Sequence, residues 1–529
     1  MNLPNMKLES GEDSRDAISR LLHSIREKGV TLWSEEGKLR YRAPKGALGP
    51  SEIERLRGSR DAIIELLAGL SGIDAAEPVL ETLPRLGRAP LTFSQLAHLD
   101  YFRFLGDRYE GRSMRVVWSA MRLCGRLDLD LLRTSLAEIV RRHGALRTLI
   151  VDCDGTPMQE ISGHVDSDIE FHDLKSVPER SREVEVERHI EQFVQKPVDI
   201  AVGPLFGVCL LRTADDEHVL IAAMEHLISD GTSLNIFVRD LLVAYAQLWK
   251  GGPVSLPPLS MQFADYAVWQ RKSEKLWLDR FHFWKGQFAD FRRTRFPQDG
   301  SSQTSPSGWA TASFRIDAEK RIELLEWSQK MNTTVVLAVF TAYVALVLRW
   351  CSVTRSVIQF QFNGRTSKKL ENTIGFFASP LHLDVILREE DTFTDLLIRV
   401  TDEYCRAHER ADSFYLATQV PRPEVTANTV FNWSPLGASI EISGTDGAQG
   451  PLACSPIRIP DDPVCKKLAH DHEPVTRFCD AGDEILGSVF FPLHRFSTAL
   501  IERFTGNLLM FVSALMRQPN QRVNNIKLL

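Results

Sequence analysis

The sequence predicts a mixed α/β protein whose main part is preceded by a small module of helices and a β-hairpin. Helical and strand-like patterns alternate from about residue 90 to residue 529, and a stretch with three prolines, 72–90, separates them from the first seventy residues. The composition is 43% hydrophobic and 25% charged, which is typical of a soluble protein with more than one core. The net charge of −6 argues against a broad nucleic-acid-binding surface.

The first seventy residues predict a compact α–β-hairpin–α module. A helix is expected after Ser14, because apolar residues follow at i, i+3, i+4 and i+7 spacing until Gly29 ends it. Two short alternating runs, 30–33 and 39–42, flank a turn with a glycine and predict the hairpin. Two more short helices near 51–57 and 61–70 complete a unit whose small size favours binding over catalysis.

The hairpin side of this module is basic. Seven lysines and arginines lie between positions 38 and 60, against two glutamates. Such a surface could attract an acidic peptide, which would add as a strand to the hairpin edge. The candidate docking residues are Lys38, Arg40, Arg42 and Lys45. The same charges fit an ordinary solvated surface equally well.

The cysteines and the apolar runs favour a cytoplasmic protein without metal or membrane contact. The eight cysteines are scattered and form no CxxC pair, a pattern typical of reduced thiols. No N-terminal secretory signal is visible, and the longest apolar run, 335–348, is too short to span a bilayer and predicts a buried core helix. One candidate zinc cluster matches no standard finger spacing, so we expect no metal there: Cys465, His470, His472 and Cys479.

One segment, MEHLISDGTS, has residues suited to catalysis. It follows an apolar run that predicts a buried strand and precedes a helix whose expected cap is Thr232 or Ser233. His226 therefore lies in a strand-to-helix turn, where a neutral imidazole suits a general base. Backbone N–H groups near Gly231 could face a developing oxyanion. Taken alone, His226 and Asp230 fit a structural histidine better than a catalytic one.

Several motifs in order resemble the condensation domains of nonribosomal peptide synthetases. The family's central HHxxxDG pattern corresponds to Glu225–Gly231, which reads EHLISDG. Further segments resemble the SxAQ-type, RHExLRT, YxDYAVW, GR…IGxFVNT and, loosely, LFQ-containing motifs: 93–97, 142–148, 263–269, 363–377 and 430–432. The resemblance runs from about residue 90 to the end of the chain. Residues 14–70 separately resemble the N-terminal docking domains of the tubulysin-synthetase type.

The resemblance implies two chloramphenicol-acetyltransferase-like lobes arranged in a V with a tunnel between them. It divides the chain into a docking domain, a linker, an N-lobe and a C-lobe: 1–72, 73–89, 90–258 and 259–529. A donor acyl group would arrive on the phosphopantetheine arm of a separate carrier protein. An amine or hydroxyl of the acceptor would enter from the other side and attack the thioester. No cofactor is expected to be bound.

The resemblance also implies roles for individual residues. His226 would deprotonate or position the nucleophile. Asp230 would support the turn by pairing with Arg365 across the lobes, although a solvated loop arginine is the alternative. Asn432 and Trp433 are candidates for the acceptor side.

The chain departs from the family pattern at the first motif histidine, which is replaced by Glu225. A glutamate beside His226 could raise the pKa of that histidine or mark a variant reaction. The FVNT stretch reads Phe-Ala-Ser-Pro at 377–380, and the DxxxxD pattern of heterocyclising relatives is absent.

The sequence therefore predicts a monomeric stand-alone acyltransferase that forms an amide or an ester, with chain release as in enacyloxin-type polyketide systems. The donor would come from an upstream carrier protein whose acidic C-terminal tail binds the docking domain, and the acceptor would be a small molecule or carrier-bound. Two alternatives remain: a catalytically inactive module that recruits carrier proteins, motivated by Glu225, and an epimerase.

Overall fold

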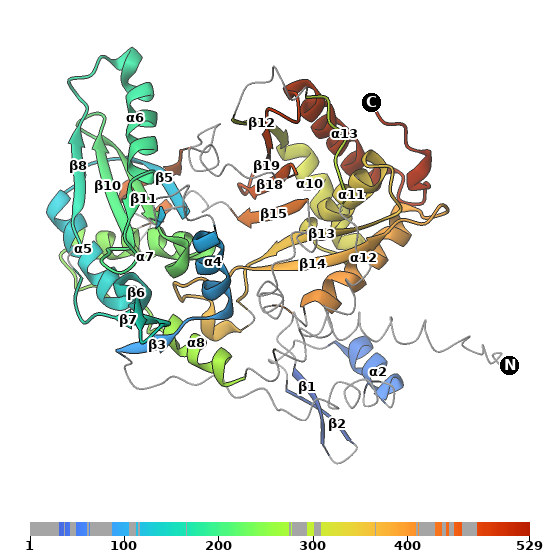
Figure 1. Ribbon diagram of the computed structural model, residues 1–529, viewed down its shortest axis with the longest axis horizontal. Coiled ribbons are helices and arrows are strands. Elements are labelled where there is room, and N and C mark those ends of the chain that lie inside the picture. The colour runs from blue at the N-terminus through green and yellow to red at the C-terminus, as the bar shows by residue number, and fades with distance from the viewer. Residues whose placement is uncertain are drawn as a thin grey trace.

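The computed structural model describes most of the chain after residue 87 and parts of the N-terminal module. The described residues are 31–35, 38–42, 49–60, 63, 87–104, 113–114, 117–165, 167–273, 277, 294–300, 308–365, 367–408, 411, 429–435, 441–443, 449–457 and 473–529. Figure 1 shows two lobes, each built on a large sheet. The predicted mixed α/β class is confirmed.

The first lobe is built on a six-stranded sheet with helices on both faces. The strands, in spatial order, are β16 (Glu441–Ser443), β17 (Gln449–Pro456), β5 (Val117–Cys124), β11 (Glu217–Met224), β10 (Phe206–Arg212) and β8 (Ile169–Asp173). Alternate residues of the buried strand β11 pack in two directions, since successive side chains point to opposite faces. Val219 and Ile221 pack toward α6 (Glu179–Val194), while Leu220 and Ala222 share a core with α5 (Leu129–Arg142) and α7 (Gly231–Trp249).

The second lobe is built on another six-stranded sheet. Its order is β12 (Trp309–Ile316), β19 (Ile485–Pro492), β18 (Val475–Asp480), β15 (Val430–Pro435), β13 (Arg355–Phe362) and β14 (Ser379–Ile386). Figure 1 shows its helices gathered beside this sheet, away from the first lobe: α10 (Ala318–Lys330), α11 (Val335–Trp350), α12 (Phe393–His408) and α13 (Thr498–Arg517). The predicted core helix is confirmed as α11, whose residues 337–348 are all buried.

Smaller elements complete the described structure. The predicted hairpin is confirmed as β1 (Thr31–Glu35) and β2 (Lys38–Arg42), followed by α2 (Pro50–Gly58). Lys45 and the expected first helix lie outside the described residues. The remaining elements are β3 (Arg88–Pro90), α4 (Phe93–Phe104), β4 (Ser113–Met114), η2 (Gly144–Arg147), β6 (Thr148–Cys153), β7 (Thr156–Ile161), β9 (Pro197–Val198), η3 (His226–Ile228), α8 (Phe263–Lys272), η4 (Lys368–Leu370) and η6 (Val523–Asn525).

Residues from the second half of the chain complete the first lobe. Strand β17 pairs with β5, β16 pairs with β17, and Leu452 and Cys454 of β17 lie in the first lobe's core. The segment between β13 and β14 contributes Ile374 and Phe377 to that same core. The lobe boundary after Pro258 stays a prediction, and the lobes are joined by packing as well as by the chain.

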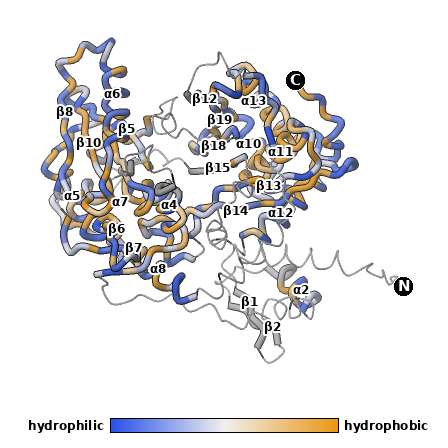
Figure 2. The backbone as a smooth tube through the Cα atoms, in the orientation of Figure 1, coloured by the Kyte–Doolittle hydropathy of each residue, from blue (hydrophilic) through white to orange (hydrophobic). Residues whose placement is uncertain are grey.

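Among the described residues, α13 is the one helix long and apolar enough by length and composition to cross a membrane. The pair α10 and α11 passes the same test only together, and it is bent by 99°. Figure 2 shows hydrophobic stretches concentrated in the sheets and in helices packed against them, α11 and α13 included. Phe504 and Phe511 of α13 are fully buried in the second lobe's core, so packing within the fold accounts for this helix.

Candidate active site

His226 lies in the short turn that joins β11 to α7. The Glu225 carboxylate accepts a hydrogen bond from the Leu227 N–H, and the Ser229 hydroxyl donates to the Glu225 carbonyl at 2.9 Å. The helix cap is Asp230, not the expected Thr232 or Ser233, because its carboxylate accepts the backbone N–H of Ser233 inside the first turn of the helix. These contacts fix the direction in which the imidazole leaves the backbone.

The His226 ring is oriented by one hydrogen bond and one aromatic contact. Its Nδ1 lies 2.7 Å from the Ser229 carbonyl oxygen. Since a carbonyl only accepts, Nδ1 carries the proton, and a neutral ring then presents Nε2 as a proton acceptor. The Phe376 ring lies 4.2 Å from the imidazole, centroid to centroid. The ring is therefore held in the tautomer that a general base requires.

Burial lowers the pKa of His226 below its ordinary value, and the neighbouring His98 lowers it further. Glu225, the Ser229 carbonyl and Asp230 each favour the protonated ring, but their combined effect is smaller. The expectation that Glu225 raises the pKa of His226 is thus correct for its own contribution, although burial and His98 make the net shift a lowering. A lowered pKa keeps the imidazole neutral near pH 7, as a base must be.

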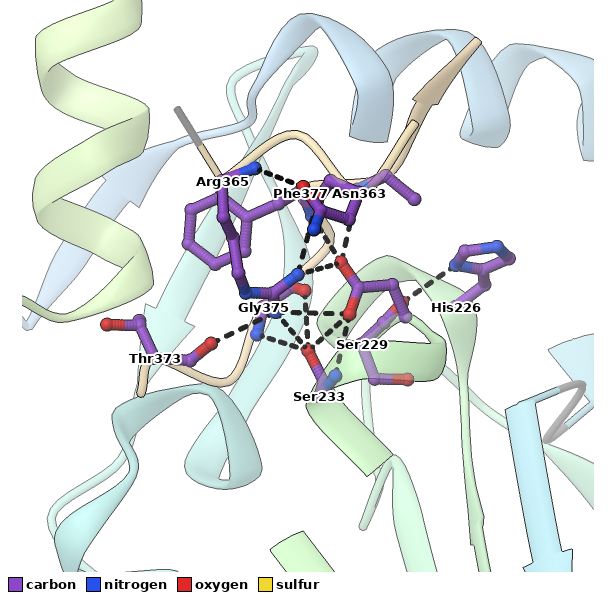
Figure 3. A network of polar contacts seen from close by, with 10 residues as sticks. His226, Ser229, Ser233, Asn363, Arg365, Thr373, Gly375 and Phe377 are labelled. Atoms are coloured by element: carbon purple, nitrogen blue, oxygen red, sulfur yellow. Dashed lines mark hydrogen bonds and ion pairs between the residues drawn. The ribbon is translucent and has the colours of Figure 1, made fainter. Parts of the chain in front are cut away.

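Asp230 accepts hydrogen bonds from a polar network whose members include Ser233, Arg365 and Phe377, which Figure 3 shows close together. Its carboxylate accepts two hydrogen bonds from the Arg365 guanidinium, at 2.9 and 3.1 Å. It also accepts from the Ser233 backbone and hydroxyl at 2.7 and 2.8 Å, and from the Phe377 and Ala378 N–H groups at 3.1 Å each. Because these six hydrogen bonds all use it as an acceptor, this carboxylate has no role in moving protons.

Arg365 joins the two lobes through the same network. It donates to the Ser233 hydroxyl at 2.9 Å and to the Thr373 carbonyl at 3.1 Å, and it lies 4.6 Å above the Phe377 ring. The Arg365 side chain is 4% exposed and that of Asp230 3%, which rules out a solvated loop arginine. The structure thus contains the cross-lobe ion pair that the resemblance implied, four residues along the chain from His226.

Two residues of α4 reach the same turn and were not singled out from the sequence. The Gln95 side chain donates to the Leu227 carbonyl at 2.7 Å and accepts from the Thr92 N–H at 2.8 Å. His98, one helical turn later, lies 5.2 Å from His226 between ring centroids. Gln95 belongs to the SxAQ-type motif, which could have marked it. No sequence signal marks His98, because its distance of 128 positions from His226 hides the contact.

The other predicted site residues lie in different surroundings. Gly231 is exposed at the start of α7, with nothing within 4 Å of the place of an added Cβ. Trp433 packs against the second lobe's core, with its ring 5.7 Å from Phe478, and Asn432 therefore points to the opposite face of that sheet. Lys38, Arg40 and Arg42 lie on β2. Their roles stay predictions.

One cluster of side chains in the described structure has metal-ligand chemistry. Glu170 and His172 lie on one face of β8, and Cys209 is directly opposite Glu170 on β10. Both Glu170 oxygens are already used, by His172 at 2.9 Å and by Lys196 at 2.5 Å, so the cluster is a satisfied ion-pair group. Of the zinc candidates in the sequence, Cys479 lies on β18 and the other three lie outside the described residues.

Comparisons with known proteins agree with this architecture. Residues 91–434 match the family model of the condensation domain, and residues 18–68 match that of the TubC N-terminal docking domain. The chain belongs to the condensation-domain family, an acyltransferase-type family of nonribosomal peptide synthetases. The predicted family and the predicted docking domain are both confirmed.

The similar curated proteins are much longer than this chain. Chondramide synthase cmdD of Chondromyces crocatus is 28% identical over 414 residues, which cover 77% of this chain and 10% of the synthase. Phosphinothricin tripeptide synthetase PhsC of Streptomyces viridochromogenes is 28% identical over 368 residues, which cover 68% of this chain and 33% of the synthetase. The chain therefore spans a third or less of the length of these relatives.

Solved structures show the same fold. The complex of the X-domain and OxyB from teicoplanin biosynthesis has a TM-score of 0.68 at 22% identity, covering 86% of this chain and 99% of that chain. The EpoB cyclization-docking bidomain from Sorangium cellulosum has a TM-score of 0.66 at 18% identity, covering 96% and 100%. The condensation domain for chain release from the enacyloxin polyketide synthase has a TM-score of 0.64 at 21% identity, covering 98% and 99%.

Proposed function

We propose that this chain transfers an acyl or peptidyl group from a carrier protein's phosphopantetheine thioester to an amine or hydroxyl acceptor, with release of the chain as an amide or ester. The observation that carries the proposal is the His226 imidazole, whose Nδ1 proton is committed to the Ser229 carbonyl at 2.7 Å. Its Nε2 is left to accept a proton. The likeness to the enacyloxin chain-release domain over 98% of the chain supports the release step.

The reaction needs one proton to move at His226. The acceptor nitrogen or oxygen attacks the thioester carbonyl carbon while its proton passes to Nε2 of His226. The carbon–sulfur bond then breaks, and the proton leaves with the pantetheine sulfur as a thiol. Backbone N–H groups at the start of α7, near Gly231, would stabilise the intermediate oxyanion. Asp230 and Arg365 hold this turn against the second lobe.

The test is turnover of an acylated carrier protein with amine and hydroxyl acceptors, followed by mass spectrometry of carrier and product. We expect His226→Ala to lose at least about 100-fold in rate, the lower range for removal of a general base. His164→Ala, an exposed histidine on another segment, is the matched control and should keep full activity. Wild-type rates in His226→Ala would contradict the proposal.

A second candidate function is carrier recruitment without catalysis, which the replacement at Glu225 favours. Both functions use the docking domain, for which we propose the acidic C-terminal tail of an upstream carrier as ligand.

A triple variant, Lys38→Glu, Arg40→Glu, Arg42→Glu, tests this docking. Its transfer rate should be lower at low carrier concentration and should recover at high concentration, because docking acts through effective concentration. Tight carrier binding with no product from any acceptor would favour recruitment instead.

A further inference from the structure

Two histidines and one buried carboxylate meet beside the candidate active site. His98 of α4 places its Nε2 3.8 Å from a carboxylate oxygen of Glu225. The same ring meets His226 at 5.2 Å with an interplanar angle of 63°, an edge-to-face arrangement. Phe376 contacts both imidazoles, at 5.5 Å from His98 and 4.2 Å from His226. The catalytic candidate therefore has a second imidazole as its immediate neighbour.

The position of His98 is fixed by the fold. Gln95, three residues earlier on the same face of α4, is fully buried and bonds the Leu227 carbonyl. That bond holds the helix against the turn that carries Glu225 and His226. The position of α4 therefore brings His98 to this turn. The His98 side chain is 17% exposed, so it is largely enclosed by its neighbours.

The Glu225 side chain is completely buried. A carboxylate removed from water is costly unless hydrogen bonds and a nearby cation compensate for it. The Leu227 N–H supplies one hydrogen bond, and the His98 Nε2 lies 3.8 Å from the same carboxylate. In the family pattern this position is a histidine, and in this chain the Glu225 carboxylate that replaces it lies at ion-pair distance from His98.

We infer that His98 and Glu225 form a compensating pair that positions His226 and sets its proton affinity, with His98 acting as a positioning residue on a second element. This inference rests on the proposed function of His226 as a base. The two members act in opposite directions, since a carboxylate attracts a proton to the neighbouring ring and an imidazole cation repels it. Replacing both side chains should therefore change the pKa of His226 less than replacing either one alone.

The groups that face His226 can be named from each element packed against it. Glu225 and Asp230 lie in its own turn, His98 comes from α4, and Phe376 is the apolar contact from the segment between β13 and β14. Asp230 also favours the protonated ring, but its carboxylate is held in the buried ion pair with Arg365. The proton affinity of His226 can thus be changed mainly through His98 and Glu225.

The experiment follows the titration of His226 by NMR of the full chain labelled with ¹³C-histidine, which has 14 such residues. His226→Gln identifies the signal. We expect His98→Phe, which keeps an aromatic ring, to raise the pKa of His226 by about 0.5–1 unit, and Glu225→Gln to lower it by a similar amount. The double variant should shift the pKa of His226 less than either single variant, because the two contributions have opposite signs. His164→Phe, at an exposed histidine, should shift nothing.

The same variants separate this inference from the proposed function. The rising limb of kcat/KM against pH should move with the NMR pKa in each variant, with KM for the carrier unchanged. The two single variants could shift the pKa of His226 in opposite directions while the wild-type protein shows no turnover. That result would support the His98–Glu225 pair and overturn the proposed function. Unchanged titration of His226 in His98→Phe, or shifts of the same sign in both single variants, would overturn the pair while leaving the base intact.

Discussion

Removing either member of the Asp230–Arg365 pair should destabilise the joint between the lobes, and the two losses should differ. Breaking a buried ion pair costs about 3–5 kcal/mol, because the remaining charge stays buried without its partner. In Arg365→Met the Asp230 carboxylate keeps four hydrogen bonds, from Ser233, Phe377 and Ala378. We therefore expect Arg365→Met to lower the free energy of unfolding by about 3 kcal/mol, the lower end of that range.

In Asp230→Ala the loss should be larger. The Phe377 and Ala378 N–H groups lose their acceptor inside the protein, and an unsatisfied buried donor costs about 1–3 kcal/mol. The variant also removes the cap of α7, which contributes about 1 kcal/mol. Asp230→Ala should therefore lower the free energy of unfolding by about 5 kcal/mol or more, the upper end of the range for a broken buried ion pair.

The assay is urea unfolding of the full chain followed by tryptophan fluorescence, with the double variant completing a cycle. The double variant should be less unstable than the two single losses added together, since no unpaired charge remains. Arg133→Met is the matched control, because the Arg133–Asp168 pair is 41% and 76% exposed and should contribute at most about 1 kcal/mol. If Arg365→Met is as mild as Arg133→Met, the network does not hold the lobes together.

Three further predictions concern Gln95, Gly375 and the buried His382. Gln95→Ala should lower acyl transfer at least about tenfold and stability by about 1–3 kcal/mol, because the Leu227 carbonyl loses its donor; unchanged rates would contradict this. Gly375→Ala should cost about 1–3 kcal/mol in urea unfolding, since an added Cβ would lie 2.2 Å from the Phe263 ring, whereas Gly231→Ala meets nothing within 4 Å and should be neutral. Burial lowers the pKa of His382 to about 3, so the unfolded chain binds a proton that the folded one refuses; stability should fall with pH below about 6.5 by ~1.4 kcal/mol per unit, less steeply in His382→Leu.

The sequence predicts the local part of the site well. An apolar strand, a turn and an amphipathic helix are short-range patterns, and they place His226 between β11 and α7 as the structure does. The sequence places the cap of α7 two or three residues too late. Asp230 and Ser233 are both good capping residues, and the choice between them depends on a carboxylate that also pairs with Arg365.

The long-range part could not be predicted from residue patterns. Strands β16 and β17 complete a sheet whose other members lie more than 200 residues earlier, and nothing in their own sequence specifies that partner. The Asp230–Arg365 pair was reached only through family resemblance, since 135 positions separate the two residues. His98 had no motif to mark it, and only the packing of α4 brings it to Glu225.

The two ion pairs near His226 differ in what they can control. Asp230 is saturated by six hydrogen bonds and lies in a joint between lobes, so changing it alters the whole turn and cannot tune one proton. The His98–Glu225 pair is longer, at 3.8 Å, and its imidazole lies 5.2 Å from that of His226 between ring centroids, so changes there alter the field at His226 without opening the lobes. Variants of Asp230 should therefore lose stability and rate together, whereas variants at His98 should shift the pH profile of kcat/KM without disturbing the joint between the lobes.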